Sequence, residues 1–391
     1  MAVSGFLSKK FKPGSRLAMI CIAVSFLVMI LAVAISSGFR REIQNGVSII
    51  AGDIRIAPAN MDMLSEANPV NRYPAYLQRL DSLKGIKEIK PVVYRAGIVK
   101  TGENIHGVLF KGISDFNANH DSSRMAVSIP SKLARILELN GGDKMTSYFV
   151  GDKVKARSFN VVEVYEAILS EEDKLVVYCD LADMQRLNGW KEDEVSAFEI
   201  TVLPSYRSRS SLSELAGECG FLAATYADDD DASVLALSSA DSYPQLFDWL
   251  DLIDFNVIVV LILMTFVAGF NMISGLLIML FEHISAIGLL KSLGMRDWPI
   301  AKTFLLSSSK VVLKGMIIGN ASAFLLCYLQ SATHLIHLSP ENYFISFVPV
   351  DINAAAILLA DLAAYFVIMI LLLLPSLFIS KVDPARTVRV R

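Results

Sequence analysis

Charged residues are scarce in this sequence. Only 19% of its 391 residues are Asp, Glu, Lys or Arg, whereas 53% are hydrophobic. The net charge is −3, so the composition offers no concentrated basic surface and gives no indication of a nucleic-acid partner. The hydrophobic residues are gathered into long runs rather than spread evenly, which indicates a membrane protein and argues against a soluble one.

The sequence also lacks the motifs of common catalytic and metal sites. It contains no G-x-x-x-x-G-K-[ST] loop to hold the phosphates of ATP, no H-E-x-x-H pair and no G-x-S-x-G turn. The acidic run at residues 228–231 lacks the spacing and the Gly turn of a calcium loop, so we interpret it as a solvated loop. No metal-ligand pattern is formed by the histidines, which are His106, His120, His283, His334 and His337. We therefore predict no catalytic residue, no metal site and no cofactor bound by this chain.

Four apolar runs predict four transmembrane helices. Residues 17–39 and 255–281 contain no charged side chain. The third helix is expected at residues 304–330, where Lys314 would extend toward the membrane surface. The fourth is expected at residues 354–379, with Asp361 inside it and a kink at Pro375. At 1.5 Å per residue, each run can cross a hydrocarbon core of ~30 Å.

The first run has an alternative interpretation as a cleaved signal peptide, because Ala32 and Ala34 form an A-x-A-like site. We favour a retained helix, because a polar helical pattern follows the run without a break. Small residues in the third run (Gly315, Gly319 and Ala323) predict a face for close helix packing. Asp361 marks an interior contact or a wet cavity, and we favour a packing or hydrogen-bonding role over a direct role in transport.

Lys and Arg in the short segments predict the orientation. They occur in the tail at residues 1–16, in the segment 282–303 and in the tail at residues 380–391, whereas residues 331–353 contain none. By the positive-inside rule, both termini and the segment 282–303 are cytoplasmic. Residues 40–250 and the loop 331–353 are then outside.

The outer segment, residues 40–250, is expected to be mixed α+β. Patterns typical of strands occur at residues 52–57, 92–99, 107–112, 159–165, 174–179 and 198–203. Helical patterns occur at residues 75–83, 131–139, 181–187 and 211–219. A more β-rich piece at about residues 101–195 predicts two lobes, one inserted into the other. The predicted fold class is thus an integral membrane α-helical protein with a large two-lobed α+β domain between helices 1 and 2.

Two of the four cysteines, Cys179 and Cys219, fall in this outer segment, where oxidation can occur. The sequence leaves open whether they form a disulfide, since it does not show that they meet. Cys21 and Cys327 fall in predicted membrane helices and are interpreted as small apolar packing residues.

The segment FEHISAIGLLKSLGMRDWPIAKTF, residues 281–304, resembles the signature of the FtsX-like permeases. In that family a membrane helix ends in an acidic residue and is followed by a short helix. The matching residues are Glu282, Ile287, Gly288, Leu290, Lys291, Leu293 and Gly294. KVDPARTVR at residues 381–389 resembles the closing signature of the family.

Further similarity to the lipoprotein-releasing LolC/LolE branch, which has a MacB-like outer domain, occurs at residues 129–145, 270–280 and 338–350. The resemblance covers the whole chain, including the order of one helix, a large domain and three helices. It implies a multi-pass protein of the bacterial inner membrane with a periplasmic domain.

The resemblance implies that the short helix docks on an ABC ATPase subunit. An amphipathic helix stopped by Gly294 would present Ile287, Leu290 and Leu293 to a groove on that partner. The alternative is a helix lying flat on the lipid surface. Residues 283–286 (HISA) replace the charged residues that the family often carries there, so docking would depend more on apolar burial.

The resemblance further implies a permease subunit that extracts lipoproteins for a periplasmic chaperone. It would pair with a second permease chain, identical or a sister, while ATP and Mg are bound by the ATPase. The acyl chains would lie between the outer halves of helices 1 and 2, in a cavity lined by Val28, Leu31, Ile35, Phe255, Val259 and Ile262. The alternatives are a MacB-type efflux or mechanotransmission permease, and a membrane-anchored sensor or binding protein without ATPase coupling.

Overall fold

The computed structural model describes residues 16–61, 68–101, 104–116, 125–151, 154–166, 175–228, 231–339, 343 and 345–376. The motif at residues 381–389 lies outside the described residues. The chain divides into two compact units. The helical unit comprises Met1–Arg40, Leu250–His337 and Phe347–Arg391, and the α+β unit comprises Arg41–Trp249 and Leu338–Ser346.

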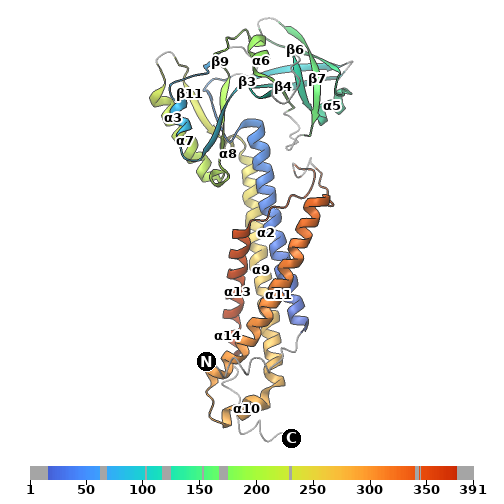
Figure 1. The fold of residues 1–391 in the computed structure, drawn as a ribbon, viewed down its shortest axis with the longest axis vertical. Coiled ribbons are helices and arrows are strands. Elements are labelled where there is room, and N and C mark those ends of the chain that lie inside the picture. The colour runs from blue at the N-terminus through green and yellow to red at the C-terminus, as the bar shows by residue number, and fades with distance from the viewer. Residues whose placement is uncertain are drawn as a thin grey trace. The chain divides into compact units, whose positions relative to one another are not determined.

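The helical unit is built from long apolar helices (Figure 1). Within the described residues, four segments are long and apolar enough to cross a membrane. They are α2 (Arg16–Ala51), α9 (Pro244–Glu282), α11 (Asp297–Thr333) and α13 (Ala354–Leu371), which is followed by α14 (Leu373–Ser376). The short helix α10 (Ile284–Ser292) lies between α9 and α11 in the chain.

The first three predicted apolar runs each fall within one of these helices, and α2 and α9 are longer than the runs predicted. The fourth run, residues 354–379, covers α13 and α14, and its residues 377–379 lie outside the described residues. Residues 40–51 continue α2 and residues 244–254 precede the second run within α9. Helical hydrogen bonding needs no apolar side chain, so hydrophobicity marks only the part of a helix that can enter lipid. The α13 helix stops at Leu371, near Pro375, whose ring nitrogen has no N–H to donate.

Small residues allow α11 to pack closely on α2. Gly315, Gly319 and Ala323 of α11 are buried. A Cβ atom at Gly319 would lie only 2.4 Å from the carbonyl oxygen of Ala23, and one at Gly315 would lie 2.7 Å from Cγ2 of Ile22. The predicted small-residue face is therefore confirmed, and its partner is α2.

Asp361 of α13 is buried against α11. The side-chain amide of Asn320 donates to its carboxyl group at 2.6 Å. Only 6% of Asp361 is exposed. The expected interior contact is confirmed, since hydrogen-bonded polar side chains of this kind join membrane helices.

The α+β unit has eleven strands in its described residues. They are β1 (Ile54–Pro58), β2 (Val70–Asn71), β3 (Ile86–Thr101), β4 (Asn104–Ile113), β5 (Ala126–Pro130), β6 (Lys144–Phe149), β7 (Lys155–Tyr165), β8 (Val176–Asp180), β9 (Glu194–Val195), β10 (Ala197–Val202) and β11 (Val234–Ser238). Its main helices are α3 (Leu77–Asp81), α5 (Ser131–Leu137), α6 (Leu181–Asn188), α7 (Arg209–Tyr226) and α8 (Ser239–Ser242).

All of the predicted strands and helices of this unit overlap observed ones, although β3 begins at Ile86 rather than at residue 92 and α7 continues to Tyr226 rather than to residue 219. Local signals explain several boundaries. The Ser208 hydroxyl accepts from the N–H of Ser211 at the start of α7, and Gly189 ends α6 with a φ of +73°. Strands β2, β5, β6, β9 and β11 were not predicted, because each is short and β6 mixes Lys, Thr and Ser with its apolar residues.

Nine of these strands form one continuous sheet in the order β11-β1-β10-β3-β4-β8-β5-β7-β6. Additional pairing of β3 with β6 closes the strands β3-β4-β8-β5-β7-β6 into a ring, which encloses the stacked rings of Phe110 and Phe159. The long strand β3 belongs both to this ring and to the open end of the sheet. The predicted lobe boundary near residue 101 is therefore not a break in the structure, because the two parts share β3.

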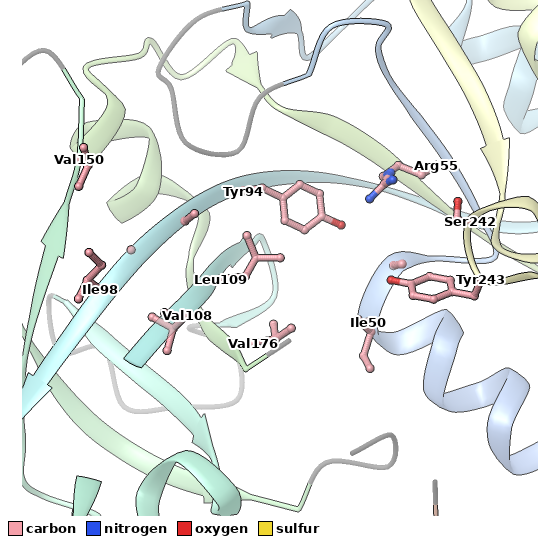
Figure 2. Close-up of a pocket in the computed structure, with 14 residues that line it drawn as sticks. Ile50, Arg55, Tyr94, Ile98, Val108, Leu109, Val150, Val176, Ser242 and Tyr243 are labelled. Carbon is pink, nitrogen blue, oxygen red and sulfur yellow. The ribbon is translucent and has the colours of Figure 1, made fainter. Parts of the chain in front are cut away.

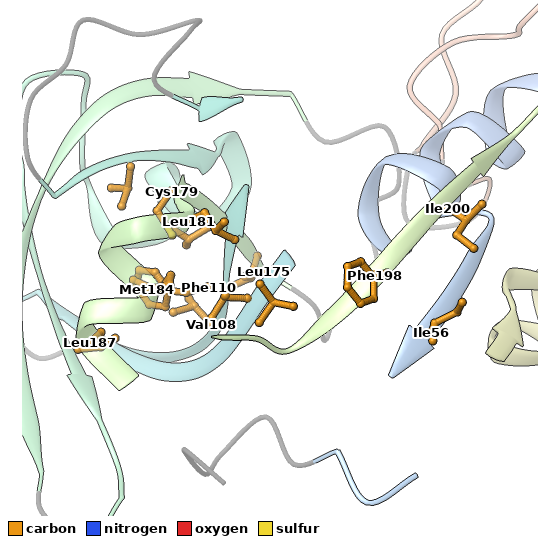
Figure 3. Packing of buried hydrophobic residues seen from close by; sticks show 14 of the residues in the cluster. Ile56, Val108, Phe110, Leu175, Cys179, Leu181, Met184, Leu187, Phe198 and Ile200 are labelled. Atoms are coloured by element: carbon orange, nitrogen blue, oxygen red, sulfur yellow. The ribbon is translucent and has the colours of Figure 1, made fainter. Parts of the chain in front are cut away.

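The core of the unit is continuous as well. Phe110, Met184 and Cys179 pack inside the ring of strands, while Ile56 and Ile200 belong to the same buried cluster at the open end (Figure 3). Helix α7 covers β11 and β1 at that end.

A buried ion pair holds the last turn of α2 within this unit. Lys111 of β4 donates from Nζ to the carbonyl oxygens of Ile49 and Ile50, each at 2.9 Å, and to Glu199 at 2.7 Å. The Tyr94 hydroxyl also donates to Glu199. Burial lowers the pKa of Lys111, and the Glu199 carboxylate opposes that shift. The ammonium group thus compensates both a carboxylate and the negative end of a helix.

Cys179 and Cys219 lie on different elements, β8 and α7, and both are free and buried. Burial raises the pKa of Cys219 to about 12 and that of Cys179 well above its usual value. We expect neither thiol to react with a maleimide in the native full-length chain at neutral pH, and both to react after unfolding, because the thiolate is the reactive form. Mass spectrometry of the labelled peptides measures this. An exposed Ser210→Cys variant is the positive control, and a disulfide-linked peptide pair would contradict the expectation.

Candidate functional site

Helix α10 forms a separate short element at the end of α9. Only His283 separates Glu282, the last residue of α9, from α10. Gly294 follows α10 with a φ of +86°. The N–H of Gly294 donates to the carbonyl of Lys291 at 2.9 Å, and that of Met295 donates to the carbonyl of Leu290 at 3.0 Å. These two bonds make a Schellman cap, which confirms that Gly294 stops the helix.

The inward face of α10 differs from the one predicted. Ile287 is only 1% exposed and belongs to the same buried cluster as Ile300 and Phe304 of α11. Gly288 is buried, and Leu290 packs half-buried on this cluster. The prediction that Ile287 is presented to a partner is therefore wrong, and Leu290 is only partly available. Both residues attach α10 to its own chain.

The outward face of α10 carries Leu289 and Leu293, which are 56% and 76% exposed. They are four residues apart and so lie on one side of the helix. Trp298, in the first turn of α11, is 65% exposed. Leu289 and Trp298 were missed by the sequence reasoning. Periodicity gives the faces of an amphipathic helix, but α10 is apolar on several sides, so only its packing shows which face is free.

The charged residues of the motif have different surroundings. Lys291 is only 10% exposed and forms an ion pair with Asp297, in the first turn of α11, at 2.9 Å. Glu282 is exposed at the end of α9. Lys291 therefore ties α10 to α11.

The six residues predicted to line a cargo cavity lie on α2 and α9. Val28, Leu31 and Ile35 are half-buried on α2. On α9 the residues grouped with Leu31 in one apolar cluster are Val257 and Leu261. The predicted α9 residues, Phe255, Val259 and Ile262, are exposed. Their spacing puts them on one face of the helix, as a continuous apolar stripe.

Next to this stripe, a polar cluster joins α2 to α9. The Ser36 hydroxyl donates to Asp254 at 2.6 Å. Arg40 donates to Asp254 as well, and to Asp251 at 3.1 Å. Sequence reasoning missed this cluster, although Arg40 follows the first apolar run directly and Asp254 precedes the second. These contacts hold the α2 and α9 helices together at one end of the candidate cavity.

The comparisons with known proteins agree with this architecture. Residues 258–384 match the family described as FtsX-like permease C-terminal. They comprise α10 and most of the helical unit that follows the α+β unit. The part of the chain that follows the α+β unit is thus similar to the C-terminal domain of FtsX-like permeases.

Within that class, its relatives include lipoprotein-releasing system transmembrane proteins. It is 21% identical to LolE of Haemophilus influenzae over 95% of this chain and 93% of that protein. It is also 21% identical to LolC of Neisseria meningitidis serogroup B over 99% of this chain and 95% of that protein. Among solved structures, the periplasmic region of MacB from Actinobacillus actinomycetemcomitans matches with a TM-score of 0.32 and 14% identity, covering 53% of this chain and 98% of that one.

Proposed function

We propose that this chain is the permease subunit of an ABC transporter that extracts lipoproteins from the bacterial inner membrane and delivers them to a periplasmic chaperone. ATP hydrolysis takes place in a separate ATPase subunit, which binds ATP and Mg. The large α+β unit is periplasmic and both termini are cytoplasmic. The lipoprotein cargo is assigned through the similarity to LolE and LolC.

The observation that carries the proposal is the exposed apolar face of α10. Leu289 and Leu293 project from a helix whose opposite side is buried and whose end is capped. An apolar helix face of this kind fits a groove on a partner protein. It lies within the segment that matches the FtsX-like permeases, which work with ABC ATPases.

The contacts of α10 provide a route for mechanical coupling. Buried Ile287 and the ion pair of Lys291 with Asp297 fasten α10 to α11. Helix α11 in turn packs on α2 through Gly319. When ATP-driven closure of the ATPase displaces α10, these contacts transfer the displacement to α11 and then to α2.

The cargo cavity needs a second permease chain, either a copy of this one or a sister permease. Phe255, Val259 and Ile262 are exposed in the single chain, as expected for a wall completed by a partner. Together with Val28, Leu31 and Ile35, they supply apolar surface for acyl chains. Covering an acyl chain with such a wall, rather than leaving it in water, is favourable by ~0.8 kcal/mol per CH₂ group.

The proposal predicts which residues retain the ATPase. In a pull-down of the tagged full-length chain in mild detergent, we expect an ABC ATPase to co-purify with the wild type. We expect it to be lost from the Leu289→Asp, Leu293→Asp double variant, because two carboxylates on the docking face cannot be buried in an apolar groove. Mass spectrometry and ATPase activity of the eluate measure both outcomes.

A matched control is Leu335→Asp, Ile336→Asp, which changes two exposed apolar residues in the loop after α11 and should leave the ATPase bound. Lipoproteins that elute with the wild type would support the lipoprotein-releasing branch, whereas their absence beside a retained ATPase would favour an efflux permease. If no ATPase co-purifies with the wild type, the coupling proposal fails and a membrane-anchored sensor becomes the better interpretation.

A further inference from the structure

The α+β unit contains an open pocket of about 500 Å³ that the proposed transport does not use. It lies between strands β3 and β4, the last turn of α2 and the end of α8. All of its lining residues belong to the α+β unit. Its size is in the range of pockets that hold small organic ligands.

One part of the pocket is apolar. Ile98, Leu109 and Val176 supply apolar side chains there, and buried Val108 borders the space (Figure 2). Gly107 of β4 adds free space, because a Cβ atom built on it would meet nothing within 4 Å. The pocket therefore has room beside an apolar wall that could cover a hydrocarbon chain.

The other part is polar and positively charged. The guanidinium of Arg55 and the hydroxyls of Tyr94 and Tyr243 lie near one another at this part of the pocket (Figure 2). Arg55 of β1 is paired in register with Glu199 of β10. The carboxylate of Glu199, however, is bound by Lys111 and by the Tyr94 hydroxyl.

Glu199 is thus the register neighbour of one cation, Arg55, and the ion-pair partner of another, Lys111. Burial raises the pKa of Tyr94 and lowers that of Lys111, and the positive charge of Arg55 acts to lower the pKa of both groups. Within the part of the chain that the structure describes, no carboxylate forms an ion pair with Arg55. The polar part of the pocket consequently has one positive charge in excess, which an anionic group would compensate.

We propose that this pocket binds an anionic amphiphile, a molecule with one hydrocarbon chain and a carboxylate or phosphate headgroup. Arg55 binds the headgroup, with the Tyr243 hydroxyl as a further hydrogen-bond donor. The hydrocarbon chain covers Ile98 and Leu109 and enters the space beside Gly107. Because Ile50 at the end of α2 is also part of the wall, the ligand contacts the turn that Lys111 holds. This site is independent of ATPase docking.

The test uses the full-length chain in nanodiscs of zwitterionic lipid and a photoreactive dodecanoic acid as probe. We expect the probe to label peptides from β3 and β4, and dodecanoate to compete with it. Dodecyltrimethylammonium, which has the same chain with a positive headgroup, should not compete. Dodecyl phosphate provides the second anionic headgroup, so its competition strength relative to dodecanoate shows which headgroup the site prefers.

Two substitutions separate the headgroup from the chain. Arg55→Gln should weaken binding about tenfold through loss of a charge-assisted hydrogen bond, whereas Arg55→Lys should retain most of it. Gly107→Phe should abolish labelling by filling the pocket. The controls are Arg157→Gln, an exposed arginine on β7, and Ile105→Phe, two residues away on β4 and outside the pocket.

Equal competition by the cationic and anionic amphiphiles would overturn the proposal, as would wild-type labelling of β3 and β4 in the Arg55→Gln variant. The Arg55 variants keep the test decisive if Gly107→Phe does not fold. ATPase co-purification, measured on the same variants, should be unchanged. Absence of the ATPase from the wild-type eluate, with labelling of β3 and β4 intact, would count against the transport proposal alone.

Discussion

Replacing Lys111 by Met is expected to lower the free energy of unfolding of the α+β unit by ~3–5 kcal/mol, the usual cost of removing one partner of a buried ion pair. The substitution leaves the buried carboxylate of Glu199 charged and without its ammonium partner. In the native pair the Lys111 side chain is 2% exposed and the Glu199 side chain is 9% exposed. The substitution also removes the donor to the carbonyls of Ile49 and Ile50 at the end of α2. For a unit of this size, the loss corresponds to a fall in melting temperature on the order of 10 °C.

Thermal unfolding of the full-length chain in detergent measures the effect. Lys144→Met, at an exposed position at the start of β6, is the matched control and should leave the melting temperature unchanged. The double variant Lys111→Met, Glu199→Gln should recover much of the loss, because it leaves no buried charge and keeps an acceptor for Tyr94. If Lys111→Met melted at the wild-type temperature, the ion pair of Lys111 with Glu199 would contribute little to the stability of the α+β unit.

The second large effect is expected at Gly319. A leucine there would place its Cβ atom 2.4 Å from the carbonyl oxygen of Ala23 and 2.9 Å from Cβ of Phe26. The first of these contacts is with backbone, which cannot move aside unless α2 and α11 separate. We expect Gly319→Leu to destabilise the helical unit by ~1–3 kcal/mol or more, and to reduce the yield of monodisperse protein.

Size-exclusion chromatography and thermal unfolding in the same detergent test this expectation. Ala321→Leu adds the same side chain at an exposed position on α11 and should have little effect. Gly315→Ala should cost less than Gly319→Leu, because it adds a single methyl group whose nearest neighbour is a side-chain atom, Cγ2 of Ile22, rather than backbone. Preservation of the wild-type stability in Gly319→Leu would show that the two helices can separate without loss.

Several features of this protein were predictable because they depend on residues close together in the sequence. Long apolar runs identified the membrane-type helices, since length and hydrophobicity are local properties. The four-residue spacing of Gly315, Gly319 and Ala323 identified a packing face, and Gly294 identified the end of α10. Most strands and helices of the α+β unit were also found from local patterns.

The sequence by itself therefore determined the membrane class, the order of the elements and the resemblance of the α10 segment. Only the tertiary structure decided which side of α10 is free, because Ile287 and Leu289 are equally apolar and differ only in what packs against them. Tertiary structure also brought Lys111 to Glu199, which is 88 residues away in the chain, and left Arg55 beside the pocket without a carboxylate of its own. Such contacts depend on strand order and register, which local periodicity does not specify.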